Sequence, residues 1–445
     1  MAKDTPNSVR NLVIYEVYVR NHGANGTFAD VEADLERIRA LSVDVVWFMP
    51  IHPIGQLNKK GSLGCPYSIS DYQEVNPEYG SKADFKRLIG KAHTLGMKVM
   101  IDVVYNHTAH DSVLVKDHPD WYHQEASGRA VTTVPDWSDV IDLKHPNPAL
   151  TTYLIDTLKG WAEFGVDGFR CDVASLLPEE FWVEARQAVA QVKPGVLWLA
   201  ESVHASFVEF RRKQGLSAIS DSEIYRGFDL TYVYDIFPIW QAAVKGMVPV
   251  ARYLEMLRFQ EAIYPRNFAK MRNVENHDND RIMSAAPSRE QALAWTAFEA
   301  FNRGAFLIYG GQESAATHTP SLFDINKVEW KDYELSPFLT KLTMLKKEPA
   351  QVSGKFIITA AEPAIQAVWL YDGGNLYGVF NVSRTSGAVK TIIPDGEYED
   401  LLGGVKVTVK SGEIAIPATA LILRVAGMLQ DVKPFHSDLM DFSVA

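Results

Sequence analysis

The sequence has little cysteine and no excess of basic residues. Cys65 and Cys171 are the only cysteines among 445 residues, so a disulfide framework or a cysteine-rich zinc finger is excluded. Lysine and arginine total 44 against 55 acidic residues, which gives a formal net charge of −11. The chain also lacks the basic runs that bind nucleic acid. We therefore expect a protein of a reducing, cytoplasmic compartment without a nucleic-acid partner.

Long apolar runs are missing as well. No stretch approaches the ~18 uninterrupted apolar residues that a membrane-spanning helix needs. The first seven residues carry no apolar segment behind Lys3, so no export signal is visible. Hydrophobic residues make up 47% and charged residues 22% of the chain, which is typical of a globular fold and excludes disorder. We expect no membrane partner.

Apolar runs of strand length alternate with amphipathic helical patterns along most of the chain. One helix is predicted to begin with Asp30 as its N-cap, and another to begin at Ser81 and end before Gly96. Such alternation is typical of a parallel sheet, and eight strand-helix units predict a (β/α)8 TIM barrel. The eight predicted strands cover residues 12–18, 43–50, 98–104, 166–171, 196–200, 228–232, 269–274 and 305–309.

Two segments depart from this alternation. In the first, residues 108–145, the hydrophobic periodicity disappears and Pro, Asp, Trp and His dominate. This composition predicts an irregular subdomain inserted after the third strand. In the second, short apolar runs joined by Asp-Gly-Gly and Ser-Gly turns predict a C-terminal antiparallel β-domain. The predicted organisation is a barrel at 1–107 and 146–348, a subdomain at 108–145, a β-domain at 349–430 and a tail at 431–445.

Acidic residues follow several predicted strands. Active sites of (β/α)8 barrels lie at the carboxyl ends of the strands. There the sequence places Asp172, Glu201 and Asp278, with Arg170 two residues before Asp172. Crowding separates the pKa values of carboxyl groups, so that one stays ionised as a nucleophile while another keeps a proton as a general acid. Glycoside hydrolysis needs this division of roles, and a retaining mechanism needs about 5 Å between the two groups.

The motifs around these residues resemble those of the α-amylase family of glycoside hydrolases. The main matches are residues 102–107 (DVVYNH), 168–172 (GFRCD), 274–278 (VENHD) and Glu201 after an apolar strand. Further matches lie at 66–80 and at 308–313 (IYGGQE). The resemblance runs from about residue 11 to 430, in the order of the family.

The resemblance implies a role for each matching position. Asp172 would be the nucleophile that forms a covalent glycosyl-enzyme intermediate, and Glu201 would be the general acid and then the base. Asp278 would hold hydroxyls of the distorted sugar as the transition state forms. In the remaining roles, Arg170 would keep Asp172 ionised, His107 and His277 would bind sugar hydroxyls, Tyr67 would stack on the sugar face, and Asp102 would support the site from beneath.

The resemblance also raises the question of a metal. Many members of the family hold a calcium ion between the inserted subdomain and the barrel, and Asn106 and Asp142 match its side-chain ligand positions. Oxygen ligands of this kind suit calcium. However, residues 173–176 (VASL) replace a segment that often holds a Lys-His pair and a backbone ligand of the metal. Calcium and no metal both stay open, the leaving-group subsites are altered, and no organic cofactor is expected.

The expected activity is that of a retaining hydrolase acting on the α-1,4 bonds of maltooligosaccharides or maltodextrin. An α-glucosidase or a transglycosylase of the same family would use the same covalent intermediate, and the sequence does not separate these outcomes. A catalytically silent carbohydrate-binding barrel is the alternative from another class. Retention of all three acids argues against it. Trp121, Trp137 and Trp330 fit either further sugar subsites or simple packing.

Overall fold

The computed structural model describes residues 4–430 and 432–436. Its centre is a barrel of eight parallel strands, as predicted. The strands are β1 (Val13–Val17), β2 (Val45–Phe48), β3 (Lys98–Val103), β6 (Gly168–Cys171), β7 (Leu197–Ala200), β8 (Leu230–Thr231), β9 (Met271–Arg272) and β10 (Ala305–Tyr309). They pair in the order β8-β7-β6-β3-β2-β1-β10-β9. A parallel bridge between Thr231 and Lys270 joins the two ends of this order and closes the barrel.

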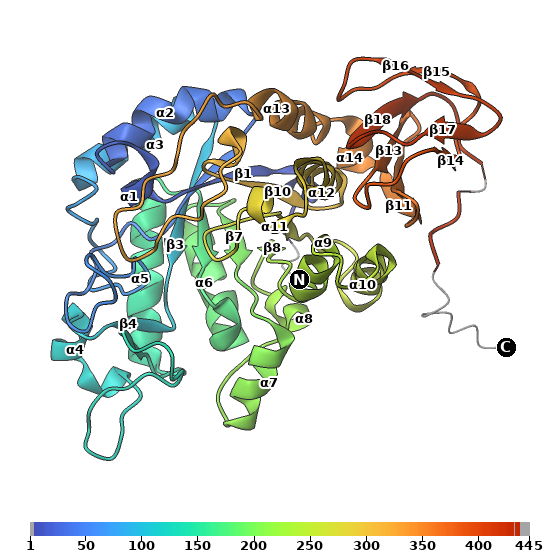
Figure 1. Ribbon diagram of the computed structural model, residues 1–445. Coiled ribbons are helices and arrows are strands. Elements are labelled where there is room, and N and C mark those ends of the chain that lie inside the picture. The colour runs from blue at the N-terminus through green and yellow to red at the C-terminus, as the bar shows by residue number, and fades with distance from the viewer. Residues whose placement is uncertain (1–3, 431, 437–445) are drawn as a thin grey trace.

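Helices surround the barrel strands (Figure 1). The longer ones carry apolar residues on the face that packs on the sheet, as in α3, where Phe85, Leu88, Ile89 and Ala92 are buried. The helices are α1 (Val19–His22), α2 (Phe28–Ala40), α3 (Lys82–Thr94), α4 (Val113–Asp117), α5 (Pro148–Phe164), α6 (Glu179–Val192), α7 (Ala205–Lys213), α8 (Asp221–Ile224), α9 (Phe237–Val244), α10 (Val250–Ile263), α11 (Ile282–Ala285), α12 (Arg289–Phe301), α13 (Ser336–Leu345) and α14 (Pro349–Ser353). Short 3-10 helices are η1 (Asn7–Asn11), η2 (Pro119–Trp121), η3 (Ala174–Leu176) and η4 (Gln312–Ser314).

Two helix starts show how local sequence sets the boundaries. Ser81 caps α3 with its hydroxyl, and Asp84 returns a bond to the backbone of Ser81, so the predicted start is confirmed. The prediction that Asp30 is the N-cap of α2 is wrong. Thr27 is the N-cap, and Asp30 lies in the first turn, where its carboxylate accepts from the Thr27 amide at 3.2 Å. The same capping box operates in both helices, so the cap lies three residues before the acid.

The segment after β3 leaves the barrel. It contains the short strands β4 (His107–Ala109) and β5 (Val140–Asp142), which pair antiparallel with His107 opposite Asp142. Helix α4 and the 3-10 helix η2 lie between these strands. The antiparallel pair returns the chain to the barrel and holds the segment against the carboxyl end of β3.

The C-terminal part is an antiparallel β-domain, as predicted. Its main sheet has the order β11-β12-β13-β18, and it packs against α12 and α14 beside the barrel (Figure 1). The strands are β11 (Lys355–Ala360), β12 (Ile365–Leu370), β13 (Asn375–Phe380), β14 (Ala388–Lys390), β15 (Gly396–Glu399), β16 (Lys406–Val409), β17 (Glu413–Ala415) and β18 (Ala420–Val425). Of the predicted tail, residues 431 and 437–445 lie outside the described residues.

Two further expectations concern cysteine and membrane contact. Cys65 and Cys171 are both free and buried, which agrees with the absence of a disulfide framework. Within the described residues, no helix combines the length and the apolarity that crossing a bilayer requires.

Candidate active site

The predicted acids lie at the carboxyl ends of the barrel strands. Asp102 is within β3, Asp172 follows β6 directly, and Glu201 follows β7 directly. Asp278 lies on the loop after β9. Parallel strands all end on the same face of a barrel, so these four residues surround one opening.

Arg170 connects three of the acids. Its Nη1 donates to Asp102 Oδ1 at 2.8 Å and to Asp172 Oδ1 at 2.9 Å, and its Nη2 donates to Glu201 Oε2 at 2.8 Å. Its Nε donates to the hydroxyl of Tyr232 at 3.2 Å. The guanidinium is fully buried, so these contacts are charge-assisted and shielded from solvent. One cation therefore fixes the positions of three carboxyl groups.

A backbone feature that sequence reasoning missed also positions Glu201. The amide of Val173 donates to Glu201 Oε2 at 2.9 Å. Val173 has φ +34°, in the left-handed region that β-branched residues rarely adopt. Val173 is the first residue of the segment 173–176, which departs from the family pattern. Because the donor is a backbone amide, the bond depends on the conformation of this turn and not on the side chain of Val173.

Burial is the largest influence on the pKa values of Asp102 and Asp172. Burial raises the pKa of Asp102 to about 6, although Arg170 opposes the shift. Burial and the neighbouring Glu201 raise the pKa of Asp172 well above its usual range, and Arg170 again opposes the shift. The predicted effect of Arg170 is present in sign but is outweighed by burial. Asp102 and Asp172 therefore both retain a proton more readily than isolated aspartates do.

His277 and Tyr67 form a second group of contacts at the site, with Asp278 and Glu16. The Nε2 of His277 lies 2.8 Å from the hydroxyl of Tyr67 and 3.3 Å from Asp278 Oδ2, while Nδ1 contacts Glu16. Burial opposes protonation of His277, but Asp278 and Glu16 outweigh it and raise its pKa to about 9. The rings of Tyr67 and His277 stack with centroids 5.4 Å apart, and the Tyr67 hydroxyl donates to Asp102 Oδ2 at 3.0 Å.

Glu16 is a site residue that sequence reasoning missed. It is fully buried in β1, among the otherwise apolar residues Val13 to Val17. A carboxylate inside an apolar strand is costly unless it is paired, so its presence there was the available signal. Its contact with His277 satisfies this requirement.

These residues border a cavity of about 230 Å³. Arg170 and Asp102 do not line the cavity but make hydrogen bonds to residues that do. His107 is buried against the edge of Trp137, with ring centroids 5.3 Å apart, and burial lowers its pKa. The predicted residues that line the cavity are Tyr67, His107, Asp172, Glu201, His277 and Asp278, joined by Trp137 and by the unpredicted Lys60 and Phe323.

The other tryptophans of the sequence analysis pack elsewhere. Trp121 stacks on His118 with centroids 3.8 Å apart. Trp330 lies under the guanidinium of Arg37 at 4.9 Å and donates to the carbonyl of His22 at 2.6 Å. Neither lines the catalytic cavity.

The residues predicted to hold calcium have protein partners. Asp142 Oδ2 accepts from the Thr133 amide at 2.9 Å and lies 3.9 Å from Nη1 of Arg211. The amide of Asn106 contacts the ring of His107 at 3.2 Å. The described residues contain no cluster of three or more His, Cys, Asp or Glu side chains that could hold a metal. The guanidinium of Arg211 thus lies near Asp142, and calcium at Asn106 and Asp142 stays a prediction.

A (β/α)8 barrel with two carboxyl groups close together at its mouth has the arrangement of acids that glycoside hydrolysis requires. Comparison with known families then places the chain among the glycoside hydrolases. The family described as "Alpha amylase, catalytic domain" matches residues 18–335, and "Bacterial Alpha amylase C-terminal domain" matches residues 357–423. The chain belongs to the α-amylase family.

Individual relatives agree with this family. The crystal structure of an α-amylase from Lactobacillus plantarum superimposes on this chain with a TM-score of 0.91, covering 95% of this chain and 100% of that chain. The two sequences are 42% identical. α-Amylase MalA from Haloarcula japonica is 25% identical over 335 residues, which is 70% of this chain but 45% of that protein. An α-1,4-glucan:maltose-1-phosphate maltosyltransferase from Rhodospirillum rubrum is 32% identical over 212 residues, or 42% of this chain and 31% of that protein.

Proposed function

We propose that the protein is a retaining hydrolase of α-1,4-linked maltooligosaccharides or maltodextrin. The observation that carries the proposal is the placement of Asp172 and Glu201 on two nitrogens of one buried guanidinium, that of Arg170. This arrangement favours the short carboxyl separation that retention needs, about 5 Å, over the wider spacing of inverting enzymes. The family implies an α-glucan substrate.

The hydrogen bonds assign a task to each oxygen. In the described residues, Oδ1 of Asp172 and Oε2 of Glu201 accept bonds from Arg170, and Glu201 Oε2 also accepts from Val173. Both residues line the cavity, and among the described residues their other oxygens, Asp172 Oδ2 and Glu201 Oε1, accept no hydrogen bond. Asp172 Oδ2 is therefore the atom that attacks the anomeric carbon, and Glu201 Oε1 is the atom that protonates the leaving oxygen. Glu201 then deprotonates the water that releases the sugar from Asp172.

Asp278 and His107 bind sugar hydroxyls, and His277 positions the side chains beside them. Asp278 retains 38% exposure of its side chain, so its carboxylate is open to sugar hydroxyls. A protonated His277 holds that carboxylate in place and also orients Tyr67. His107 lies on the other side of the cavity and, because burial keeps it neutral, it exchanges hydrogen bonds with a hydroxyl without adding charge.

A second candidate is transfer of the glycosyl group to a sugar acceptor instead of water. Its support is an apolar cluster beside Glu201, formed by Val173, Leu176, Val203, Val208 and Ala218 with Trp137 and Phe207 packed against it. Val173 and Trp137 of this cluster also line the cavity, where apolar groups disfavour ordered water and favour the carbon face of an acceptor sugar. The likeness to a maltosyltransferase over 42% of the chain points the same way.

One experiment separates these functions. The enzyme is incubated with maltoheptaose, panose, isomaltose, sucrose and trehalose, and the products and their anomeric form are followed by proton NMR. We expect α-anomeric products from maltoheptaose, with longer oligosaccharides if transfer competes. A β-anomer as first product would refute retention, and activity on isomaltose or sucrose alone would refute the α-1,4 assignment.

We also propose a cytoplasmic setting, which the free, buried Cys65 and Cys171 support.

A further inference from the structure

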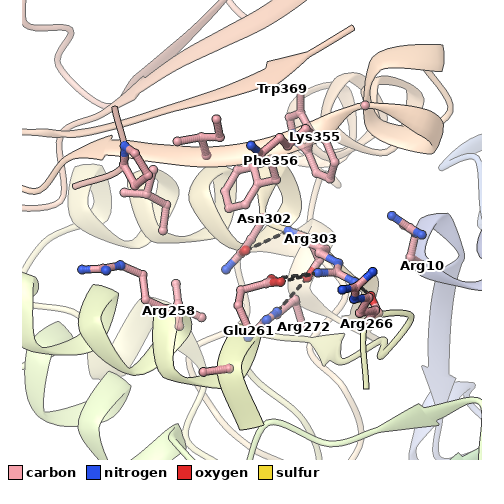
Figure 2. A pocket seen from close by; sticks show the side chains of 16 residues that line it. Arg10, Arg258, Glu261, Arg266, Arg272, Asn302, Arg303, Lys355, Phe356 and Trp369 are labelled. Atoms are coloured by element: carbon pink, nitrogen blue, oxygen red, sulfur yellow. Dashed lines mark hydrogen bonds and ion pairs between the residues drawn. The ribbon is translucent and has the colours of Figure 1, made fainter. Parts of the chain in front are cut away.

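A second cavity lies at the end of the barrel opposite the acids. Its volume is about 620 Å³, against about 230 Å³ for the catalytic cavity. Arg10, three residues before β1, and Arg303, two residues before β10, line it, so it lies where the barrel strands begin. The C-terminal part of α10 and the start of β11 complete its walls (Figure 2). The cavity is thus enclosed jointly by the barrel and the β-domain.

The lining of this cavity is strongly basic. Glu261 is the one acidic residue among the described residues that line it. The whole chain has a net charge of −11, so the basic character is local. The basic residues around the cavity are Arg10, Arg258, Arg266, Arg272, Arg303 and Lys355.

Among the described residues, Arg303 is the only one of these six basic side chains with a carboxylate within 4.0 Å. Glu261 contacts only Arg303, at 2.6 and 2.8 Å. In the described part of the chain, neither Arg258 nor Arg266 has a carboxylate within 4.0 Å. Burial and the nearby Arg303 lower the pKa of Arg10, while Glu261 opposes the shift. Concentrating like charges without counter-charges is unfavourable unless something else offsets the repulsion.

A buried donor lies among these groups. Arg272 is 3% exposed and lines the cavity. Its Nε donates to the carbonyl of Arg303 at 3.0 Å and its Nη2 to Gln260 at 3.0 Å, but within the described residues its Nη1 has no partner. Nε of Arg303 also lacks a partner there. An unsatisfied buried donor of this kind is available to an ordered water, an ion or a ligand.

The chemistry of the lining narrows the class of ligand. Arginines outnumber lysines here, and the planar guanidinium fork matches the oxygens of a phosphoryl group. One wall is aromatic, since Phe356 packs on the buried Trp369 with ring centroids 5.0 Å apart. A flat organic group can lie against such a wall. The volume is within the range of pockets that enclose small organic molecules, about 300–1,000 Å³.

We propose that the cavity between the barrel and the β-domain binds a small phosphorylated metabolite, with its phosphoryl group at Arg258, Arg272 and Arg303 and its organic part against Phe356. The site is separate from the acids, at the other end of the barrel. A sugar phosphate and a nucleotide share the phosphoryl chemistry that this lining recognises, and the experiment distinguishes them.

The test is calorimetric titration of the full chain with glucose 6-phosphate and with ADP, alongside glucose and adenosine as uncharged counterparts. We expect one of the phosphorylated probes to bind with Kd below about 1 mM at about 0.1 M salt, and its uncharged counterpart to bind at least about tenfold more weakly. Raising the salt concentration should weaken the binding, because the contact is charge-dependent. Failure of both phosphorylated probes to bind would overturn the proposal, as would equal binding of the uncharged probes.

Matched variants locate the binding. The double variant Arg258→Gln with Arg266→Gln removes two lining charges and should weaken binding by about tenfold or more. The control, Arg129→Gln with Arg384→Gln, removes two exposed charges outside the cavity and should change Kd by less than about twofold. Lys355→Gln, at an exposed lining position, gives an independent third variant whose folding is not at risk. Equal weakening in the control pair would show that only net charge matters and would overturn the proposal.

Discussion

The two ends of the barrel hold charge in opposite ways. At the carboxyl end one buried cation, Arg170, serves three carboxyl groups, and each contact is between 2.8 and 2.9 Å. At the amino end six basic residues line a cavity with a single acid, Glu261, which contacts only Arg303. At the first end a single substitution affects every partner of the shared group. At the second, Arg258 and Arg266 have no carboxylate partner among the described residues, so substituting either of them breaks no ion pair.

The largest expected effect follows from removing the nucleophile. Asp172→Asn should lower the hydrolysis of maltoheptaose by about 10³-fold or more, because the amide oxygen cannot form the covalent intermediate. Its melting temperature should stay equal or rise, since burial already disfavours the ionised carboxyl. Asp156→Asn, an exposed acid on α5, is the control and should keep wild-type activity. Hydrolysis near the wild-type rate in Asp172→Asn would refute the assignment.

The next prediction compares the loss of stability on substituting one arginine at each end of the barrel. Arg170→Lys keeps the charge but loses the fork that holds the three acids, so it should destabilise the fold by about 3 kcal/mol. Arg258→Lys, at the amino end, should change stability by less than about 0.5 kcal/mol. Thermal unfolding of both variants at neutral pH provides the measurement. Similar losses in the two variants would contradict the view that the ends differ in how their charges are coupled.

The residues at the carboxyl end could be predicted because the hydrophobic period locates each strand and the position of an acid just after a strand places it at that end. An apolar run of strand length followed at once by an acid places Asp172 and Glu201 at a strand end, and an i−2 spacing places Arg170 on the same face as Asp172. Tyr67 and His277 came from motif resemblance alone. Their mutual stacking depends on loops whose lengths no period describes.

The amino end was not accessible in this way. Its charges come from Arg10, Arg258, Arg303 and Lys355, which are far apart in sequence and share no motif. Only the closure of the barrel and the docking of the β-domain bring them together. The left-handed Val173 was missed for a related reason, since nothing in its residue type predicts a positive φ.

A smaller effect concerns the pH dependence of stability. The folded pKa of His277, about 9, exceeds the usual value of 6.5, so its protonation stabilises the fold fully below pH 6.5 and this contribution is lost as pH rises through 9. The shift corresponds to about 3 kcal/mol at most. The difference in melting temperature between wild type and His277→Gln should therefore shrink between about pH 6.5 and 9.5. A constant difference across this window would show that His277 does not titrate there.

The smallest expected effect tests whether a metal contributes at the carboxyl end. Chelation with EDTA should shift the melting temperature by less than about 1 °C and leave hydrolysis unchanged, because Arg211 already lies beside Asp142 and compensates its charge. Arg211→Gln should lower the melting temperature, since it leaves Asp142 buried without its cation. If chelation lowers the melting temperature of the wild type by several degrees and calcium restores it, the predicted ligands Asn106 and Asp142 do hold the metal. The carboxyl end would then depend on an external cation, as we propose that the amino end depends on an external anion.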